Sequence, residues 1–296
     1  METLTLPTQA GFSKEKRTAI IYASVMILIH LGILLTIWTG VSPVAFWVAF
    51  AFYLIRGFGI SIGYHRYFSH KSYKTGRFFQ FIIALMGSVA NQGGVLWWSS
   101  THRGHHKYSD QKEDHHSPIV YGFWHSHIGW MWSKEAYMKT TIKCNDLAKF
   151  PEIKALNKYY AFIMLFQVIG FFGLGAFLNN VYPELGTSGL QMLVWGFFIS
   201  TVFMWHSTFM VNSVCHLWGY KRYKNSGDFS RNNPLVSLVT FGEGWHNNHH
   251  KYGWSARNGL RWWEFDPSYY LLKTLAVFGI VHDLRVPTKE QLSATH

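Results

Sequence analysis

Four long apolar stretches constrain this chain of 296 residues more than any other feature of its sequence. They cover residues 18–38, 44–63, 159–178 and 190–211, and each is close to the length of about 20 residues that a helix needs to cross a bilayer. Charged residues make up only 14% of the chain, against roughly 25% in soluble domains. The sequence therefore predicts an all-α integral membrane protein with four transmembrane helices.

The positive charge lies almost entirely on one side of these predicted spans. The N-terminus and the segments 64–158 and 212–296 carry 26 of the 27 Lys and Arg residues, and Arg56 in the second span is the other. Because cytosolic segments are enriched in Lys and Arg, both termini are predicted to be cytosolic. Residues 1–296 then form a single domain, with 64–158 and 212–296 as its cytosolic cap. The charge reflects membrane topology, so nucleic acid is not an expected partner.

A fifth apolar stretch, residues 78–89, is too short for a span and suits a re-entrant, interfacial or buried helix. A crossing here would put the histidine motifs before and after it on opposite sides of the membrane. With four spans, all of these motifs lie on the cytosolic side. The positions of the basic residues and of the histidines therefore favour the same topology.

Histidine is over-represented, with 17 copies, and nine of them fall into recognisable spacings. These are an HxxxxH motif, two HxxHH motifs and one histidine four residues after Asn212, namely His65, His70, His102, His105, His106, His216, His246, His249 and His250. On a helix, the three imidazoles of HxxHH project from one face. The two histidines of HxxxxH are about 140° apart on an α-helix, so a helix end is expected between them.

Nine imidazoles predict a metal centre and exceed the coordination capacity of one metal. Two metals with four or five nitrogen ligands each would use them all, and iron, zinc and copper all accept imidazole. Zinc usually takes four ligands, so the number of histidines favours iron. Glu243 is expected either to orient a ligand histidine or to act as a charge near a helix N-terminus.

The other histidines do not have the spacing of ligands. His30 and His206 lie in predicted spans and are expected to be packed or hydrogen-bonded. Four more, His115, His116, His125 and His127, lie in a polar loop and are not expected to bind metal.

The motifs resemble those of the integral-membrane fatty acyl-CoA desaturases, most closely the stearoyl-CoA Δ9 desaturase-like group. The similarity extends over about residues 20 to 285 and is carried by the segments 65–70, 102–106, 212–216 and 242–250. The last segment begins Gly-Glu-Gly-Trp-His-Asn, which distinguishes this group from membrane alkane and carotenoid hydroxylases.

The resemblance implies two irons bound by nine histidines beneath a helical cap. The first iron would be held by His65, His70, His102, His106 and His249, and the second by His105, His216, His246 and His250. Asn212 would reach the first iron through a water molecule. The family also has a kinked acyl tunnel, whose bend would be lined here by Gln92, Trp98 and Thr208. The floor of that tunnel would lie at Tyr53 and Gly57 on the second span.

The implied activity is the O2-dependent introduction of a cis double bond, at Δ9, into a saturated long-chain acyl thioester, with acyl-CoA as the expected carrier. An unactivated methylene has no acidic proton, so acid–base catalysis cannot remove its hydrogen and the metals must do so. Two electrons must come from an external donor of the ferredoxin, rubredoxin or cytochrome b5 type. The membrane would be the inner or plasma membrane of a bacterium, or the endoplasmic reticulum of a eukaryote.

Two positions depart from the animal acyl-CoA enzymes and leave the carrier open. Those enzymes have Arg-Asp next to the second histidine motif, in contact with CoA, where this chain has Ser100 and Thr101. They also have a Trp near the thioester where this chain has Phe209. Acyl carrier protein and a glycerolipid ester are therefore alternative carriers. A membrane di-iron fatty acyl or alkyl hydroxylase is the alternative activity, and a non-catalytic metal-binding or transport protein is a third.

Overall fold

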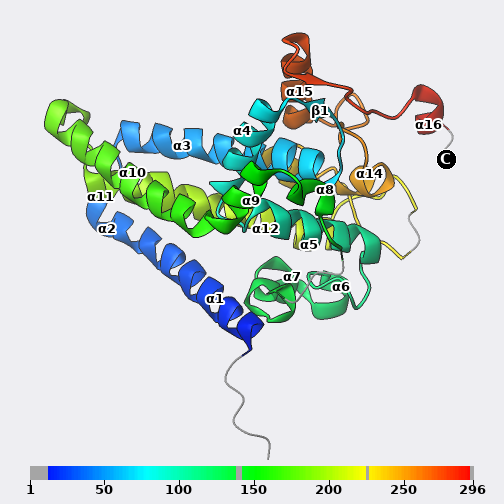
Figure 1. The fold of residues 1–296 in the computed structure, drawn as a ribbon, viewed down its shortest axis with the longest axis horizontal. Coiled ribbons are helices and arrows are strands. Elements are labelled where there is room, and N and C mark those ends of the chain that lie inside the picture. Colours follow the sequence, from blue (N-terminus) through cyan, green and yellow to red (C-terminus); the bar gives the residue numbers. More distant parts are fainter. Residues whose placement is uncertain (1–12, 138–141, 225–226, 294–296) are drawn as a thin grey trace, which may run out of the picture.

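The computed structural model describes residues 13–137, 142–224 and 227–293. This part of the chain is mostly helical, and its two short strands, β1 (Lys74–Thr75) and β2 (Val281–His282), form one antiparallel pair. Four helices are long and apolar enough to cross a bilayer, and they project to one side of the molecule, with the shorter helices gathered around their other ends (Figure 1). The predicted all-α membrane fold is confirmed.

The four candidate spans are Lys14–Thr39, Pro43–Ser69, Tyr160–Val181 and Gly189–Leu217. Each contains one of the predicted apolar stretches to within a residue. Their component helices are α1 (Lys14–Gly32), η1 (Ile33–Leu35) and α2 (Thr36–Thr39); α3 (Pro43–Phe58) and η2 (Gly59–Ser69); α10 (Tyr160–Val181); and α11 (Gly189–Leu193), η6 (Val194–Ile199) and α12 (Ser200–Leu217). The second and fourth spans continue beyond their apolar parts, and these extensions carry His65 and His216 toward the cap.

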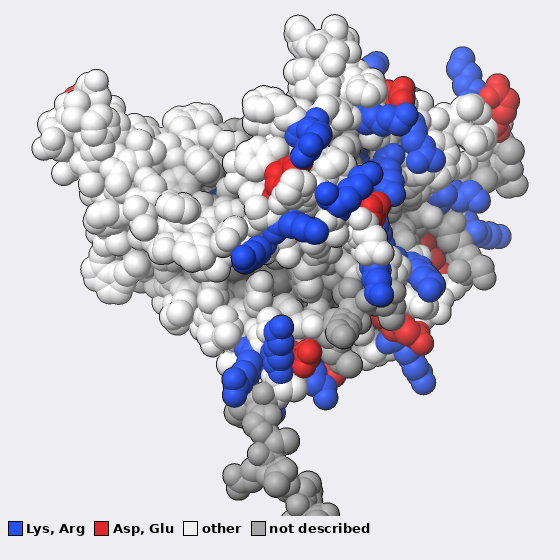
Figure 2. Space-filling view, viewed as in Figure 1, with Lys and Arg blue, Asp and Glu red and all other residues white. Residues whose placement is uncertain are grey.

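The cap comprises the described residues of 64–158 and 212–293. Its separate elements are α4 (Arg77–Ser88), α5 (Val95–Tyr108), α6 (Pro118–Tyr121), α7 (Phe123–His127), η3 (Gly129–Trp132), η4 (Glu135–Tyr137), α8 (Asn145–Ala148), α9 (Pro151–Lys158), α13 (Pro234–Val239), α14 (His246–Lys251), α15 (Pro267–Val277) and α16 (Lys289–Ser293). A further short helix, η5 (Pro183–Leu185), lies in the loop between the third and fourth spans. Lys, Arg, Asp and Glu gather over the cap, whereas the projecting spans are almost free of them (Figure 2).

The fifth apolar stretch forms α4, which packs along η2 with one face buried and the other exposed. Glycines allow the two helices to approach closely. A Cβ atom on Gly59 would lie 2.3 Å from the backbone of Met86, and one on Gly63 would lie 2.7 Å from the carbonyl oxygen of Ile83. The close contact fixes η2, and with it the first histidine motif, against the cap.

The buried side chain of Arg56 links the second span to the third and fourth spans by hydrogen bonds. The side chain is fully buried, and its guanidinium donates to the carbonyl oxygens of Val89 and Gly196 and to Oε1 of Gln167. These acceptors lie just after α4, in η6 and in α10. A buried charge in a membrane protein is costly unless it is hydrogen-bonded, so this network explains how the fold retains a cation there.

Candidate metal centre

The nine histidines of the spaced motifs form two adjoining clusters. The five-histidine cluster contains His65, His70, His102, His106 and His249, and the four-histidine cluster contains His105, His216, His246 and His250. Within each cluster, one ring nitrogen from every histidine lies within 4.8 Å of all the others. The grouping in space is the same as the grouping that the resemblance implies.

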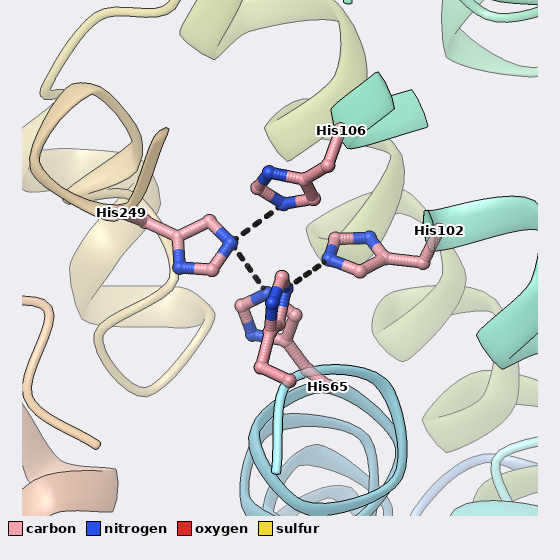
Figure 3. Close-up of side chains that lie close together, drawn as sticks. His65, His102, His106 and His249 are labelled. Carbon is pink, nitrogen blue, oxygen red and sulfur yellow. Dashed lines mark hydrogen bonds between the residues drawn. The ribbon is translucent and has the colours of Figure 1, made fainter. Parts of the chain in front are cut away.

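The five-histidine cluster draws its side chains from η2, α5 and α14 (Figure 3). The Nε2 atoms of His65 and His249 are 2.9 Å apart, and those of His249 and His106 are 2.8 Å apart. His70 and His102 are joined in the same way at 2.7 Å. The ring nitrogens therefore converge from three separate elements on one point.

The backbone of η2 explains how His65 and His70 can face the same point. It is a π-helix, and the amide of His70 donates to the carbonyl of His65 at 3.2 Å, the i→i+5 pattern. The wider π-helical turn brings residues five apart closer to one face than on an α-helix, where they are about 140° apart. The helix also ends at this point, with His70 as its C-cap, as the sequence predicts.

The four-histidine cluster combines α5, α14 and the end of α12. Nε2 of His246 lies 3.0 Å from that of His216 and 3.0 Å from that of His250. Nε2 of His105 lies 3.2 Å from that of His250. Helices α5 and α14 contribute to both clusters, because successive residues of an α-helix point about 100° apart.

Burial keeps several of the histidine rings neutral, His102, His106 and His249 among them. Burial, together with the neighbouring imidazoles, keeps the pKa values of His102, His106 and His249 well below the usual value for histidine. A neutral imidazole has one N–H and one lone pair, so several Nε2 atoms that converge on one point cannot all be paired with each other. A metal cation resolves that conflict, and the all-nitrogen donor set suits iron, zinc or copper.

Four carboxylates lie beside the Nδ1 atoms of histidine rings. The pairs are His65 with Glu243 at 2.5 Å, His105 with Asp114 at 2.9 Å, His216 with Asp110 at 2.9 Å and His250 with Asp228 at 3.1 Å. Such a contact fixes the tautomer that leaves Nε2 free for a metal. Three of the four pairs support the four-histidine cluster.

Glu243 orients a histidine and does not cap a helix. It is buried, and α14 begins three residues after it, at His246. Besides His65, its carboxylate accepts from Arg66 at 3.0 Å and from Asn258 at 3.0 Å. Burial alone would raise the pKa of Glu243, but His65 and Arg66 lower it to about 2, so the carboxylate stays ionised.

The sequence does not single out the other three carboxylates. Asp110 and Asp114 follow α5, and Asp228 lies in the loop before α13. Burial alone would raise the pKa of Asp114, but contacts with His105 and His116 hold it well below its usual value. The only sequence signal for Asp110 and Asp114 is that they follow the second histidine motif, which ends at His106, within eight positions.

A small cavity with two adjoining parts lies beside both clusters. One part, of about 50 Å³, and a second part, of about 40 Å³, share four lining residues: Trp98, His102, Thr208 and Asn212. The first part also reaches Gln92, whose Nε2 donates to Oγ1 of Thr208 at 2.9 Å. The structure thus brings the predicted bend residues and Asn212 together next to the histidines.

Tyr53 and Gly57 lie elsewhere. They share a face of α3, as predicted, but neither lines the cavity beside the clusters. The ring of Phe241 covers them, 5.5 Å from the Tyr53 ring, and a Cβ atom on Gly57 would lie 1.9 Å from it. Tyr53 instead lines an apolar cavity of about 270 Å³ between the second and fourth spans.

Three of the remaining histidines form a chain outside the clusters. His206 lies 3.1 Å from His30 and 2.9 Å from His127, which agrees with the hydrogen-bonded role predicted for the two histidines in the spans. His116, which was not expected to bind metal, lies beside the four-histidine cluster. Its Nδ1 lies 2.7 Å from Asp114, and its ring lies 4.5 Å from that of His105.

The fold and the site define a helical membrane protein with four candidate spans and two buried histidine clusters suited to metal. The family model for fatty acid desaturases matches residues 42–281. The chain therefore belongs to the fatty acid desaturase family, a family of oxidoreductases.

Curated relatives within this family differ in carrier and in double-bond position. The chain is 39% identical over 251 residues to the sn-1 stearoyl-lipid 9-desaturase of Synechocystis sp., covering 83% of this chain and 73% of the relative. It is 38% identical over 250 residues to the acyl-CoA C20 Delta5-desaturase of Anemone leveillei, covering 83% and 75%. It is 35% identical over 281 residues to the Delta-9 acyl-lipid desaturase 1 of Arabidopsis thaliana, covering 94% and 87%.

Proposed function

We propose that this protein introduces a cis double bond into a saturated long-chain acyl thioester, at the Δ9 position and with acyl-CoA as carrier, using O2 and two external electrons. The observation that carries the proposal is the small cavity lined by His65 and His102 of the five-histidine cluster and by His105 and His246 of the four-histidine cluster. An acyl chain in this cavity would pass beside both metal positions.

Two irons are the proposed cofactors, one in each histidine cluster, with Asn212 near the first through a water molecule. The converging Nε2 atoms and the ionised carboxylates behind them fit such cations. When bound, the irons would supply the O2 and one-electron chemistry that no side chain can perform. Every other contribution comes from the chain itself.

The residues of the chain position the substrate and exclude water. Trp98 stacks on His102, with ring centroids 5.1 Å apart, so the bend and the cluster are one packed unit. Gln92 fixes the hydroxyl of Thr208 on the opposite wall. The walls of the cavity would thus select which pair of methylenes lies beside the metals.

A glycerolipid ester is the second candidate carrier. Ser100 is uncharged and buried, at one of the two positions where the animal acyl-CoA enzymes have Arg-Asp. Two of the relatives described above are named as lipid desaturases. Incubation with stearoyl-CoA and with a stearoyl glycerolipid in separate assays decides between them.

The proposed orientation places both termini and the cap in the cytosol. Basic side chains dominate the charged surface of the cap (Figure 2), which would suit an acidic electron donor of the ferredoxin, rubredoxin or cytochrome b5 type. Because this attraction is electrostatic, the rate at which the donor associates with the cap would fall as ionic strength rises.

The test is the fatty acid profile of a host that expresses this chain, compared with a host that expresses His249→Ala. We expect new monounsaturated acid with the wild type only, detected by gas chromatography and mass spectrometry. A hydroxylated acid would establish the hydroxylase alternative. No dioxygen-dependent product from metal-loaded wild type would refute the catalytic proposal.

A further inference from the structure

The indole of Trp130 is a buried hydrogen-bond donor without a partner in the described part of the chain. Trp130, in η3, is 5% exposed, and its Nε1 has no acceptor among the residues that the structure describes. Other indoles are satisfied: Nε1 of Trp97 donates to the Ala136 carbonyl at 2.9 Å, and Nε1 of Trp205 donates to the Ala90 carbonyl at 3.0 Å. Because buried donors are normally paired, this one indicates a missing acceptor.

The unpaired donor belongs to a residue that lines the cavity beside the clusters. Trp130 and Thr101 both line the part of about 50 Å³ that continues to His102. The hydroxyl of Thr101 is likewise buried and has no partner among the described residues. Gln92, another polar residue of this wall, is already committed to Thr208. Two unused donors therefore belong to one stretch of the cavity.

The indole of Trp130 is held rigidly. It stacks on Trp97 with an angle of 3° between the rings and centroids 6.0 Å apart. On another side it meets His116 at 5.0 Å, and Nδ1 of His116 is anchored on Asp114. A donor held by its neighbours is preorganised for an acceptor at a fixed position.

We propose that Nε1 of Trp130 and Oγ1 of Thr101 bind the carbonyl oxygen of the acyl ester or thioester. The proposal rests on the proposed function, because an acyl chain in this cavity has that oxygen as its acceptor. Phe209 lines the same part of the cavity and has no group that can donate a hydrogen bond. Fixing the carbonyl sets the number of carbons between it and the metals, and so sets the double-bond position.

Pairs of ligands that differ only in this carbonyl test the proposal without catalysis. One pair is stearoyl-CoA and its S-octadecyl thioether, and the other is 1-stearoyl and 1-O-octadecyl lysophosphatidylcholine. Dissociation constants are measured by displacement of a fluorescent acyl probe from purified wild type, Trp130→Phe, Thr101→Val and the control Trp132→Phe. Trp132 lies in the same short helix but is 44% exposed and does not line the cavity.

We expect wild type and Trp132→Phe to prefer the carbonyl compound by about tenfold in at least one pair, and Trp130→Phe and Thr101→Val by about threefold or less. The pair that shows the preference identifies a thioester or a glycerolipid ester as the source of the carbonyl. The proposal is overturned if both variants keep the wild-type preference. It is also overturned if the wild type has no preference, which is the result expected if a bound water is the partner of these donors. Thr101→Val serves alone if Trp130→Phe fails to fold.

Double-bond position provides the second readout. In active enzyme, loss of the carbonyl contact should convert one positional isomer into a mixture and raise KM more than it lowers kcat. A variant that retains a single isomer and the wild-type KM contradicts the proposal even if the wild type is a desaturase. Conversely, if the wild type is inactive but still prefers the carbonyl compound, the result supports this binding site and counts against the proposed activity.

Discussion

The two histidine clusters lie side by side but differ in what stands behind them. His106 of the five-histidine cluster stacks on His250 of the four-histidine cluster, with centroids 4.5 Å apart. Among the residues that the structure describes, three histidines of the four-histidine cluster contact carboxylates, whereas only His65 does so in the five-histidine cluster. The cluster with fewer imidazoles thus has more negative charge behind it. Since an ionised partner makes an imidazole a stronger electron-pair donor to a metal, we propose that the carboxylates would compensate for the smaller number of imidazoles.

Removal of one ligand from each cluster should give the largest difference. His216→Ala leaves three imidazoles in its cluster, and His106→Ala leaves four in the other. We expect the first variant to fall from about two irons per chain to about one, and the second to keep a weakly bound second iron. Iron content after dialysis against a chelator, measured by mass spectrometry, makes the comparison. Equal loss from both variants would contradict the compensation.

The carboxylates themselves should matter next. Asp114→Asn removes the partner of His105, and Glu243→Gln removes the partner of His65. In the second variant Arg66 keeps Asp266 as a counter-ion at 2.9 Å, so the fold should persist. Each change should weaken one metal site by roughly 10- to 100-fold. A chelator titration measures both affinities, and a variant that loses both metals in parallel would show that the clusters are not independent.

Close packing of η2 should matter for one cluster only. Gly59→Ala places a Cβ atom against the backbone of Met86 and should displace α4 from η2, at a cost of about 1–3 kcal/mol in unfolding free energy. His65 and His70 then shift, and the five-histidine cluster loses metal first. Gly76→Ala is the matched control, because a Cβ atom there meets nothing within 4 Å. The Tm and iron content of the two variants are compared, and equal behaviour would count against this explanation.

The smallest effect is expected at His116. It contacts one carboxylate oxygen of Asp114 and His105 contacts the other, so His116→Ala removes one of the two imidazole contacts of that carboxylate. We expect the affinity of the four-histidine cluster to fall by less than about tenfold. His115→Ala is the control, since His115 belongs to neither cluster. A loss as large as that of Asp114→Asn would make His116 a ligand in its own right.

Local periodicity and composition predicted most of the fold. The apolar stretches gave the four spans, since bilayer thickness imposes one length on them. The HxxHH spacing placed several imidazoles on one helix face, which is a property of helix geometry alone. The assignment of His105 to a different cluster from His102 and His106 came only from the family resemblance. It could not be made from the spacing, because it depends on how α5 packs between η2 and α14.

Features that depend on tertiary contacts could not be predicted in this way. The π-helical form of η2, which aligns His65 with His70, follows from packing and from no residue pattern in the motif. Asp110 meets His216 across 106 positions of the sequence, and nothing in the spacing of either residue signals the pair. The unpaired indole of Trp130 could not be predicted from the sequence for the same reason, because hydrogen bonding of a donor depends on its neighbours in space.

The most direct test of the account is the Mössbauer spectrum of protein reconstituted with 57Fe. Two unequal histidine clusters, each with one iron, predict two quadrupole doublets of equal area. Asp114→Asn should change one doublet and Glu243→Gln the other. A single doublet, one iron per chain, or both doublets changed by either variant would contradict the central claim that the protein holds two distinct metal sites.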